Sequence, residues 1–281
     1  MLPPIIFAAV LAASTAQAVT PPHDSSLLNH PDRGYRFGLT AEIGTVKALA
    51  HRIQFSNNGT MFDYVADGGQ DILFPFTRLT ADLDIGERHS VVLLYQPLTL
   101  RSEIQLQDEL VVDNGTFAAG EALDLKYGFD FYRASWLYDL QADPSRELGL
   151  GLSLQLRNAD IQFTSADGTL RRVNRDLGPV PILKLRTRQP LKGAAWWGLE
   201  VDGFYAPIKY INGSDTDVVG AIADASLRVG VPLELGGEAF LNLRYVGGGA
   251  EGTSQRYDGP GDGYVENWVH FVALSLGLSL R

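Results

Sequence analysis

The sequence predicts an all-β fold: a single up-and-down antiparallel transmembrane β-barrel of about ten strands. Three observations lead to this prediction. Apolar residues recur at every second position along most of the chain, with polar or small residues between them. The connections between these segments alternate between short and long. After the first residues, no apolar run approaches the roughly 18 residues of a membrane-spanning helix, so a membrane crossing would have to use strands.

The amino terminus has the features of a secretory signal peptide. Residues 5–13, "IIFAAVLAA", are too few to span a bilayer as a helix, and Ala16-Gln17-Ala18 is a cleavage site of the small-x-small type. The preceding "MLPP" departs from the usual pattern because it lacks Lys and Arg. We expect residues 1–18 to be a signal peptide, residues 19–34 a flexible lead segment rich in Pro and Ser, and residues 35–281 the barrel.

The period-two pattern is clearest in residues 217–233. Val219, Leu227 and Val231 share one face there, whereas Asp224 and Arg228 share the other. The same criterion places ten strands at residues 37–55, 73–85, 89–105, 122–140, 147–164, 180–189, 196–211, 217–232, 238–247 and 266–281.

The connections fall into two classes. Every second one is short, such as "GER" at 86–88 and "ADPSR" at 142–146, and most of the others are longer and polar, such as 56–71 and 248–263. This alternation is typical of outer-membrane barrels, which have short periplasmic turns, long outer loops and an even number of strands. The last strand, 266–281, is then expected to close the barrel against the first.

Aromatic residues are expected to mark the two membrane interfaces. Eight residues separate Trp197 from Tyr205, which corresponds to about 20 Å along the axis of a tilted barrel. The aromatic residues predicted to lie at the interfaces are Tyr95, Trp136, Tyr138, Trp197, Tyr205 and Trp268.

With its signal peptide, absent cysteines and ten period-two strands, the chain resembles bacterial outer-membrane β-barrel proteins over residues 35–281. Residues 68–79 and 127–140 look like segments of uncharacterised proteins of this type. The resemblance implies location in the bacterial outer membrane, lipid as a partner, and recognition of the last strand by the barrel-assembly machinery. The chain departs from such proteins in ending on Leu280-Arg281 instead of an aromatic residue. We expect a monomer.

No catalytic residues, metal site or cofactor are predicted, and a net charge of −10 argues against a nucleic-acid partner. Of the five histidines, His51 and His270 alone lie near the outer half, where His270 shares the lipid-facing side of its strand. Gly-Leu-Ser at 151–153 and at 277–279 lacks the second glycine of a nucleophile elbow. Omptin-like proteases are also ten-stranded, but the acids of the predicted outer rim match no motif of theirs. These acids are Asp63, Asp67, Asp71, Asp215 and Asp217.

The strongest signal is a set of charged residues on the faces predicted to line the lumen. They are Arg78, Asp82, Lys184, Arg186, Arg188, Glu200, Asp202, Asp224 and Arg228. One register of the hairpin near Lys192 puts Arg186 opposite Glu200 and Lys184 opposite Asp202. A shifted register puts Lys184 opposite Glu200. Either brings cations to acids across the strands, so we expect these side chains to fill the lumen as a plug.

The first functional hypothesis is therefore a non-enzymatic outer-membrane barrel with a filled lumen and a structural or surface-interaction role. One alternative is an outer-membrane hydrolase or lipid-modifying enzyme with its site at the outer rim, and another is a narrow solute channel. A soluble periplasmic ligand-binding barrel would need its apolar faces inside. Faces rich in Leu and Val opposite paired charges argue against that arrangement.

Overall fold

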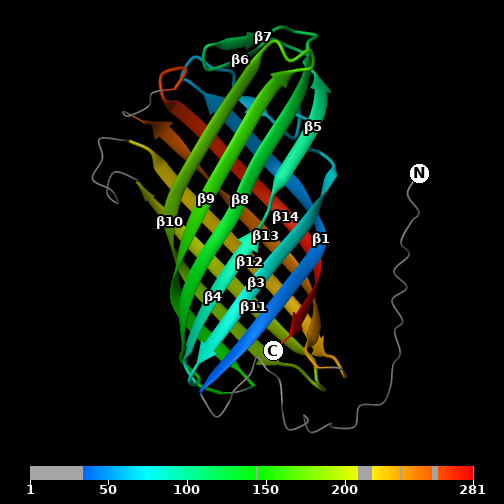
Figure 1. Ribbon diagram of the computed structural model, residues 1–281, viewed down its shortest axis with the longest axis vertical. Coiled ribbons are helices and arrows are strands. Elements are labelled where there is room, and N and C mark those ends of the chain that lie inside the picture. The colour runs from blue at the N-terminus through cyan, green and yellow to red at the C-terminus, as the bar shows by residue number, and fades with distance from the viewer. Residues whose placement is uncertain (1–33, 144, 208–216, 235, 255–258, 281) are drawn as a thin grey trace, which may run out of the picture.

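The computed structural model describes residues 34–143, 145–207, 217–234, 236–254 and 259–280. Twelve of the described strands form one antiparallel sheet that closes when β14 pairs with β1 (Figure 1), and β6 and β7 form a separate pair. The barrel has ten wall strands, because β4 and β5 pair in succession with β8 and form one of them. The wall consists of β1 (Tyr35–Phe55), β3 (Leu73–Ile85), β4 (His89–Gln96) with β5 (Thr99–Gln105), β8 (Ala122–Asp139), β9 (Glu147–Ser165), β10 (Arg171–Pro190), β11 (Trp196–Pro207), β12 (Val219–Pro232), β13 (Glu238–Thr253) and β14 (Tyr264–Leu280).

Three short strands lie outside the wall. β2 (Phe62–Asp63) pairs with β1, and β6 (Leu110–Val112) pairs with β7 (Gly115–Phe117) in a hairpin over one end of the barrel (Figure 1). We call this end the long-loop end, because the connections 56–72 and 106–121 lie there. The opposite end carries the turns 86–88 and 191–195 and is called the short-turn end.

The predicted fold class is confirmed, with two strands longer than expected. The strand predicted at 180–189 begins at Arg171, so only residues 166–170 separate it from β9. Pro179 and Pro181 obscured it, since proline cannot donate to a ladder. They are tolerated because β10 pairs with β9 over this stretch, whereas its described ladder with β11 begins only at Leu183. The strand predicted at 238–247 continues to Thr253.

Some expectations concern parts of the chain outside the described residues. These are the signal peptide, nearly all of the lead segment, and the last four residues of the strand predicted at 196–211. Among the described residues, no helix is long and apolar enough to cross a membrane.

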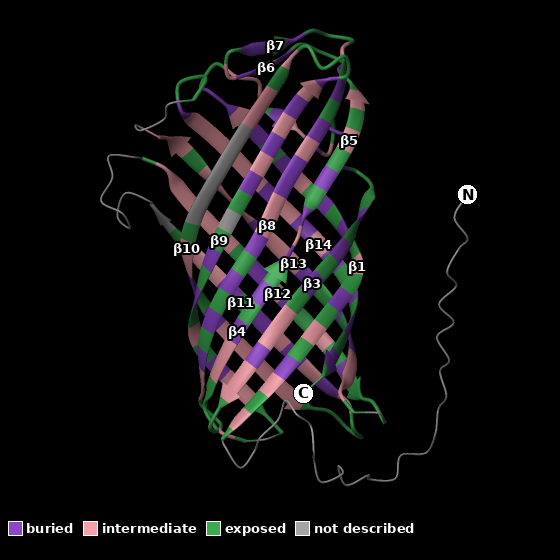
Figure 2. Cartoon of the chain, in the orientation of Figure 1, coloured by how far each residue is buried: buried purple, intermediate pink, exposed green. Residues whose placement is uncertain are grey.

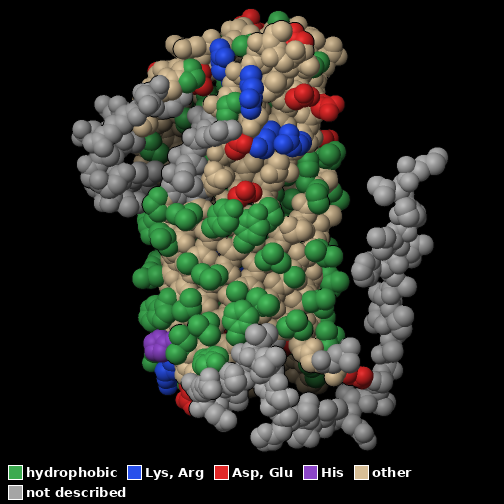
Figure 3. Space-filling model, viewed as in Figure 1, with side chains coloured by type: hydrophobic (Ala, Val, Ile, Leu, Met, Phe, Trp, Pro, Cys, Tyr) green, Lys and Arg blue, Asp and Glu red, His purple; other side chains and the backbone are tan. Residues whose placement is uncertain are grey.

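In the half of the barrel nearer the short-turn end, apolar side chains point outward. On β9, Leu152 is 58% exposed whereas Ser153 and Gln155 are buried, and on β14 Leu274 is 56% exposed whereas Ser275 is buried. The alternation of buried and exposed residues is visible along the ribbons in Figure 2. On the face in Figure 3, hydrophobic side chains cover the part toward the short-turn end, and charged side chains gather beyond them. We call these outward apolar residues the apolar band.

Toward the long-loop end the pattern reverses along the same strands. Beyond Leu156 on β9, Ile161 and Phe163 are apolar and buried inside, whereas Asp160 and Gln162 lie on the outward face. β1, β3, β8 and β14 reverse in the same way, with apolar residues inside from Val46, Phe76, Phe131 and Phe271 onward. We call this part the protruding half. The expectation of outward apolar faces thus holds in the band and is wrong beyond it.

Candidate functional site

The charged residues predicted for the lumen do point into it, and they form two groups that also include partners that the sequence had not indicated. The first, which we call the central ionic network, begins at Lys184 on β10. Its Nζ lies 2.6 Å from Glu200 Oε1 and 2.9 Å from Asp202 Oδ2, both on β11. The side chain of Lys184 is 1% exposed, so these two carboxylates replace its water shell.

Arginines from other strands extend this network across the lumen. Arg133 on β8 lies 2.9 Å from Asp202 and 3.0 Å from Asp224. Arg244 on β13 binds Asp224 at 2.6 Å. On the other side, Arg78 on β3 lies 3.0 Å from Glu200. Both Arg133 and Arg244 were missed by sequence reasoning, although each lies on the inward face of its strand.

Glu42 on β1 is the acid at the far side of the network and was also missed. Its carboxylate is fully buried and accepts hydrogen bonds from Asn242 at 2.7 Å and Ser275 at 2.8 Å. Arg228 lies 3.4 Å and Arg78 3.8 Å from the same carboxylate. Glu42 is the sole acid in "LTAEIGTV". The only sequence signal that could have found it is its position in the alternation, which puts it on the inward face of the strand.

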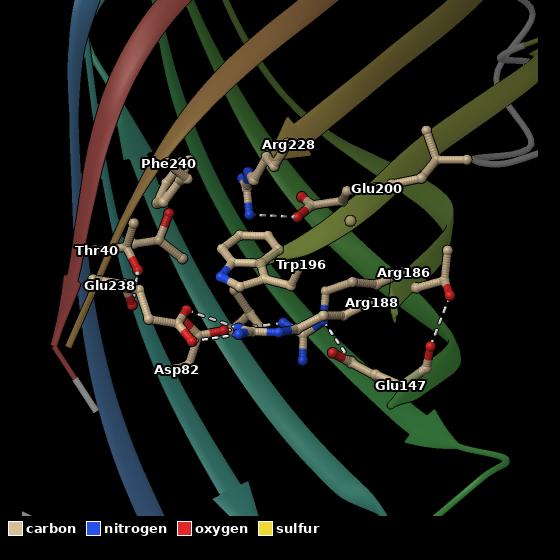
Figure 4. Close-up of a pocket in the computed structure, with 16 residues that line it drawn as sticks. Thr40, Asp82, Glu147, Arg186, Arg188, Trp196, Glu200, Arg228, Glu238 and Phe240 are labelled. Atoms are coloured by element: carbon tan, nitrogen blue, oxygen red, sulfur yellow. Dashed lines mark hydrogen bonds and ion pairs between the residues drawn. The ribbon is translucent and has the colours of Figure 1, made fainter. Parts of the chain in front are cut away.

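The second group lies nearer the short-turn end, around the cavity drawn in Figure 4. Arg186 binds Asp82 at 3.0 Å and Glu147 at 2.6 Å. Arg188 donates to Glu238 at 2.8 Å and lies 4.1 Å from the ring centroid of Trp196. The cavity between them measures about 60 Å³, which is enough for a few water molecules. These contacts narrow the lumen to a small polar vestibule.

Beyond the central ionic network, the lumen of the protruding half is filled by an apolar core. Aliphatic and aromatic side chains from β1, β5, β8, β9 and the β6–β7 hairpin pack together there. Tyr64, Phe117, Leu123 and Phe163 are each at most 1% exposed. The described side chains therefore fill the lumen in two chemically different layers, one ionic and one apolar.

The loops of the long-loop end hold the β6–β7 hairpin over this core. The backbone N–H of Thr60 donates to Val111 O at 2.8 Å. Ser56 Oγ lies 3.2 Å from Asp113 Oδ1, and Asp262 accepts from Asn57 N at 3.0 Å and Asn57 Nδ2 at 2.9 Å. The backbone N–H of Tyr264 and the amide donors of Asn57 lower the pKa of Asp262. Burial raises the pKa of Asp113, with Asp262 nearby adding to the effect. We call this assembly the cap.

His51 belongs to the apolar core and not to a catalytic group. Its ring stacks on Tyr64 at 4.4 Å and meets the edge of Tyr127 at 4.2 Å, and its Nδ1 lies 2.8 Å from Gln70 Oε1. His270 faces outward, as expected, with its Nδ1 2.6 Å from Tyr245 Oη. Within the described residues, neither histidine is hydrogen-bonded to a serine or an acid.

The rim acids are engaged separately where the structure describes them. Asp63 binds Arg52 at 3.2 Å and accepts backbone hydrogen bonds from its own turn, while Asp217 accepts from Thr253 N at 2.9 Å. Asp67 and Asp71 are exposed, and Asp215 lies outside the described residues. No group of three His, Cys, Asp or Glu side chains in the described part of the chain could hold a metal ion.

All the aromatic residues predicted for the interfaces lie on outward faces of the wall. Tyr95 stacks on Tyr132 at 5.0 Å, Trp136 stacks on His89 at 5.8 Å, and Tyr205 is 71% exposed. The others are Tyr138, Trp197 and Trp268. Their position at lipid interfaces stays a prediction.

The ladder, the outward apolar band and the filled lumen define a closed antiparallel barrel of the outer-membrane type. No protein-family model matches the chain, and no curated protein matches it. Among solved structures, it is similar to the outer membrane protease OmpT from Escherichia coli, with a TM-score of 0.43, 9% identity, and coverage of 87% of this chain and 96% of that one.

Two other barrels are similar at lower scores. Ail, the attachment invasion locus protein of Yersinia pestis, was solved with the heparin analogue sucrose octasulfate; its TM-score is 0.33, at 11% identity, covering 87% of this chain and 99% of that one. The toluene transporter TodX of Pseudomonas putida has a TM-score of 0.36, at 8% identity, covering 87% and 90%. The fold assignment rests on the strand ladder and not on these scores.

Proposed function

We propose that the chain is a bacterial outer-membrane barrel that does not conduct, and that it has a structural or surface-interaction role. In this proposal the short-turn end faces the periplasm and the long-loop end faces outward. The observation that carries the proposal is the closure of the lumen in two layers, the central ionic network and the apolar core. A channel needs a continuous aqueous path, and a lumen filled with packed side chains lacks one.

The apolar band supports the membrane location. Leu152, Leu243, Leu274 and Ile43 are each more than half exposed, and such residues encircle the barrel. From Leu148 to Leu156 the band is about 20 Å high on a tilted strand, close to the band of known transmembrane barrels. So much contiguous apolar surface would cause aggregation in water. The reversal beyond Leu156 then marks where the wall leaves the lipid.

The protruding half supports the surface-interaction role. It has its own apolar core, and the cap is held by hydrogen bonds between three separate connections. A rigid, polar-surfaced extension of this kind presents loops to the outside while the membrane part serves as the anchor. Export by the signal peptide, a monomeric state and insertion through the last strand are parts of the same proposal.

Bilayer recordings test the proposal directly. Purified protein refolded into planar bilayers should give no steady ohmic conductance, whereas its heated and unheated forms should migrate differently on a gel. Steady channels would support the narrow-channel alternative and overturn the proposed closure. Fractionation of the cells that produce the protein should place it with outer-membrane lipid, and recovery in the soluble periplasmic fraction would overturn the membrane anchor.

The enzyme alternative has a separate test. Among the described residues, no histidine lies in hydrogen-bonding contact with a serine or an acid: His51 contacts Gln70, and His270 contacts Tyr245. Detergent-solubilised protein should therefore release no product from chromogenic esters or from fluorogenic peptides. Turnover that disappears in an Asp63→Asn or His270→Gln variant would reinstate an outer-rim hydrolase.

A further inference from the structure

A group of cationic and aromatic side chains lies on the outside of the wall, next to the apolar band on its long-loop side. It contains Lys47 and Arg52 from β1, Trp268 and His270 from β14, and Tyr245 from β13. The ladders arrange them in neighbouring rows: Lys47 and Tyr245 both flank Val272, His270 lies opposite Gly247, and Trp268 lies between Arg52 and Gly249. We call this group the outward basic strip.

Glycines on β13 shape the strip. A Cβ at Gly247 would lie 2.4 Å from Tyr245 Oη and 2.9 Å from His270 Nδ1, so a side chain there would displace both groups. Without one, Tyr245 lies across Gly247 and places its hydroxyl 2.6 Å from His270 Nδ1. In the tautomer in which Tyr245 donates to Nδ1, the imidazole proton is on Nε2, which leaves His270 one donor for a ligand.

The two cations of the strip are exposed, and each donates to an oxygen of the segment 56–72. Lys47 Nζ donates to the carbonyl oxygen of Asp71 at 2.7 Å, and Arg52 Nε donates to Asp63 at 3.2 Å. The side chain of Arg52 is 67% exposed. The register shifts between Ala48 and Ala50, which changes the positions of β1 that face outward. Arg52 therefore lies on the outward face although its position number is even. Glu251 and Glu266, opposite each other in the next row, bound the strip on the long-loop side.

Apolar residues bound the strip on its other side. Ile43 on β1, Leu274 on β14 and Leu243 on β13 are outward and exposed, and they belong to the apolar band. A ligand on this surface would therefore meet hydrogen-bond donors and positive charge at one end and a hydrocarbon-like wall at the other. Lipids with anionic headgroups have this polarity, and they attract Lys and Arg next to a membrane surface.

We propose that the outward basic strip binds the phosphate-bearing headgroup of an outer-leaflet lipid, with the acyl chains lying against Ile43, Leu243 and Leu274. This inference rests on the proposed outer-membrane location. Lys47, Arg52 and His270 supply the donors to the phosphate oxygens, and Trp268 lies at the depth of the headgroup. A free phosphate ion would use the same donors but would gain nothing from the apolar end.

The wall provides a matched control pair of cations. Arg101 on β5 and Lys126 on β8 are opposite each other on the outward face, and Lys126 is paired with Asp160. Six residues separate Lys126 from Tyr132, the last apolar outward residue of β8, which amounts to about 14 Å of height on a tilted strand. The outward basic strip differs in Lys47, which lies opposite Val272, only two residues from Leu274, so the control pair lacks a cation at the edge of the apolar band.

The experiment uses the full mature chain in detergent and measures bound lipid by native mass spectrometry. The probes are dioleoylphosphatidic acid, diolein as the same lipid without phosphate, and inorganic phosphate. We expect phosphatidic acid to bind, diolein to bind at least tenfold more weakly, and inorganic phosphate not to compete at equal concentration. The Lys47→Ala/Arg52→Ala variant should bind phosphatidic acid roughly 10- to 30-fold more weakly, and Arg101→Ala/Lys126→Ala should stay within about twofold of the parent.

Each other outcome overturns the inference. Equal losses in the two double variants would mean diffuse electrostatics, and equal binding of diolein would mean contact with acyl chains alone. Efficient competition by inorganic phosphate would identify a free-anion site. An unchanged heat-dependent gel shift in both variants verifies that they fold. If the parent stays monodisperse without detergent, the proposed membrane location fails; if it needs detergent but Lys47→Ala/Arg52→Ala binds normally, only this inference fails.

Discussion

Arg186 lies directly opposite Glu200 in the β10–β11 ladder, yet its guanidinium binds Asp82 on β3 and Glu147 on β9. Glu200 is bound instead by Lys184, at 2.6 Å, and by Arg78 from across the barrel, at 3.0 Å. The long cationic side chains thus form ion pairs with acids across the lumen and not only with acids on the neighbouring strand. As a result, the ion pairs connect strands that are not neighbours in the sheet, and the barrel is cross-braced from inside.

Glu200→Gln should weaken this bracing strongly. The variant leaves Lys184 and Arg78 buried with one carboxylate fewer, and breaking a buried pair costs about 3–5 kcal/mol when the remaining charge is desolvated. The measurement is the free energy of unfolding from lipid vesicles, followed by tryptophan fluorescence in denaturant. Glu238→Gln is the matched control, because Glu238 is more exposed and pairs with Arg188 near the short-turn end. Equal midpoints for the two variants would contradict the central role of Glu200.

Arginine substitutions on one strand should reveal where the lipid ends. Leu152 and Asn158 both lie on the outward face of β9, the first inside the apolar band and the second beyond it. Leu152→Arg should destabilise folding into bilayers by about 2–4 kcal/mol if Leu152 is near the midplane, and Asn158→Arg by no more than about 1 kcal/mol. Refolding equilibria in vesicles measure both. A larger penalty at Asn158 would show that the band has been placed on the wrong part of the strand.

Alternation and loop lengths predicted the wall and limited the register of the β10–β11 hairpin to two alternatives. The observed ladder pairs Lys184 with Asp202 and Arg186 with Glu200, which is the first of the two registers expected from the sequence. The full ionic network could not be predicted in the same way. Glu42 and Arg228, or Arg133 and Asp224, come from strands far apart in the chain, and only closure of the barrel brings them together.

The reversal of the apolar face has a physical cause that leaves a trace in the sequence. Within lipid the outside of a strand must be apolar, whereas beyond the lipid the outside meets water and the apolar side chains turn to the lumen. On β9, the apolar positions are even up to Leu156 and odd at Ile161 and Phe163. In the proposed membrane location, a change of phase within one uninterrupted strand marks the membrane boundary, a signal that a search for simple alternation does not detect.

The two acids of the cap should respond in opposite ways to neutralisation. The pKa of Asp113 is raised by burial and by Asp262, so ionised Asp113 destabilises the cap, and this cost disappears as the pH falls through its raised pKa. The pKa of Asp262 is lowered by hydrogen bonds from Tyr264 N and Asn57, so ionised Asp262 stabilises the cap until the pH falls through its lowered pKa. At neutral pH, Asp113→Asn should slow proteolysis within residues 106–121, and Asp262→Asn should accelerate it.

Asparagine suits both positions. It tolerates the left-handed backbone of Asp113, whose φ is 51°, and its side-chain oxygen can still accept from Ser56. Lowering the pH from neutral through the raised pKa of Asp113, but not as far as the lowered pKa of Asp262, should stabilise the cap of the parent but not that of Asp113→Asn. Equal acceleration of proteolysis in both variants would remove the electrostatic account of the cap.

Phe117→Ala tests whether the two layers of the lumen close it independently. Phe117 is the last residue of β7 and is fully buried in the apolar core, and removing a buried phenylalanine ring costs about 3–5 kcal/mol of local stability. The cap should then be cleaved by protease within residues 106–121, while the heat-dependent gel shift of the barrel stays unchanged. Val111→Ala, at a half-buried position of the same hairpin, should behave like the parent.

Planar bilayers should still show no steady conductance with Phe117→Ala, because the central ionic network closes the lumen below the apolar core. Conductance in this variant would show that the apolar core alone is the seal.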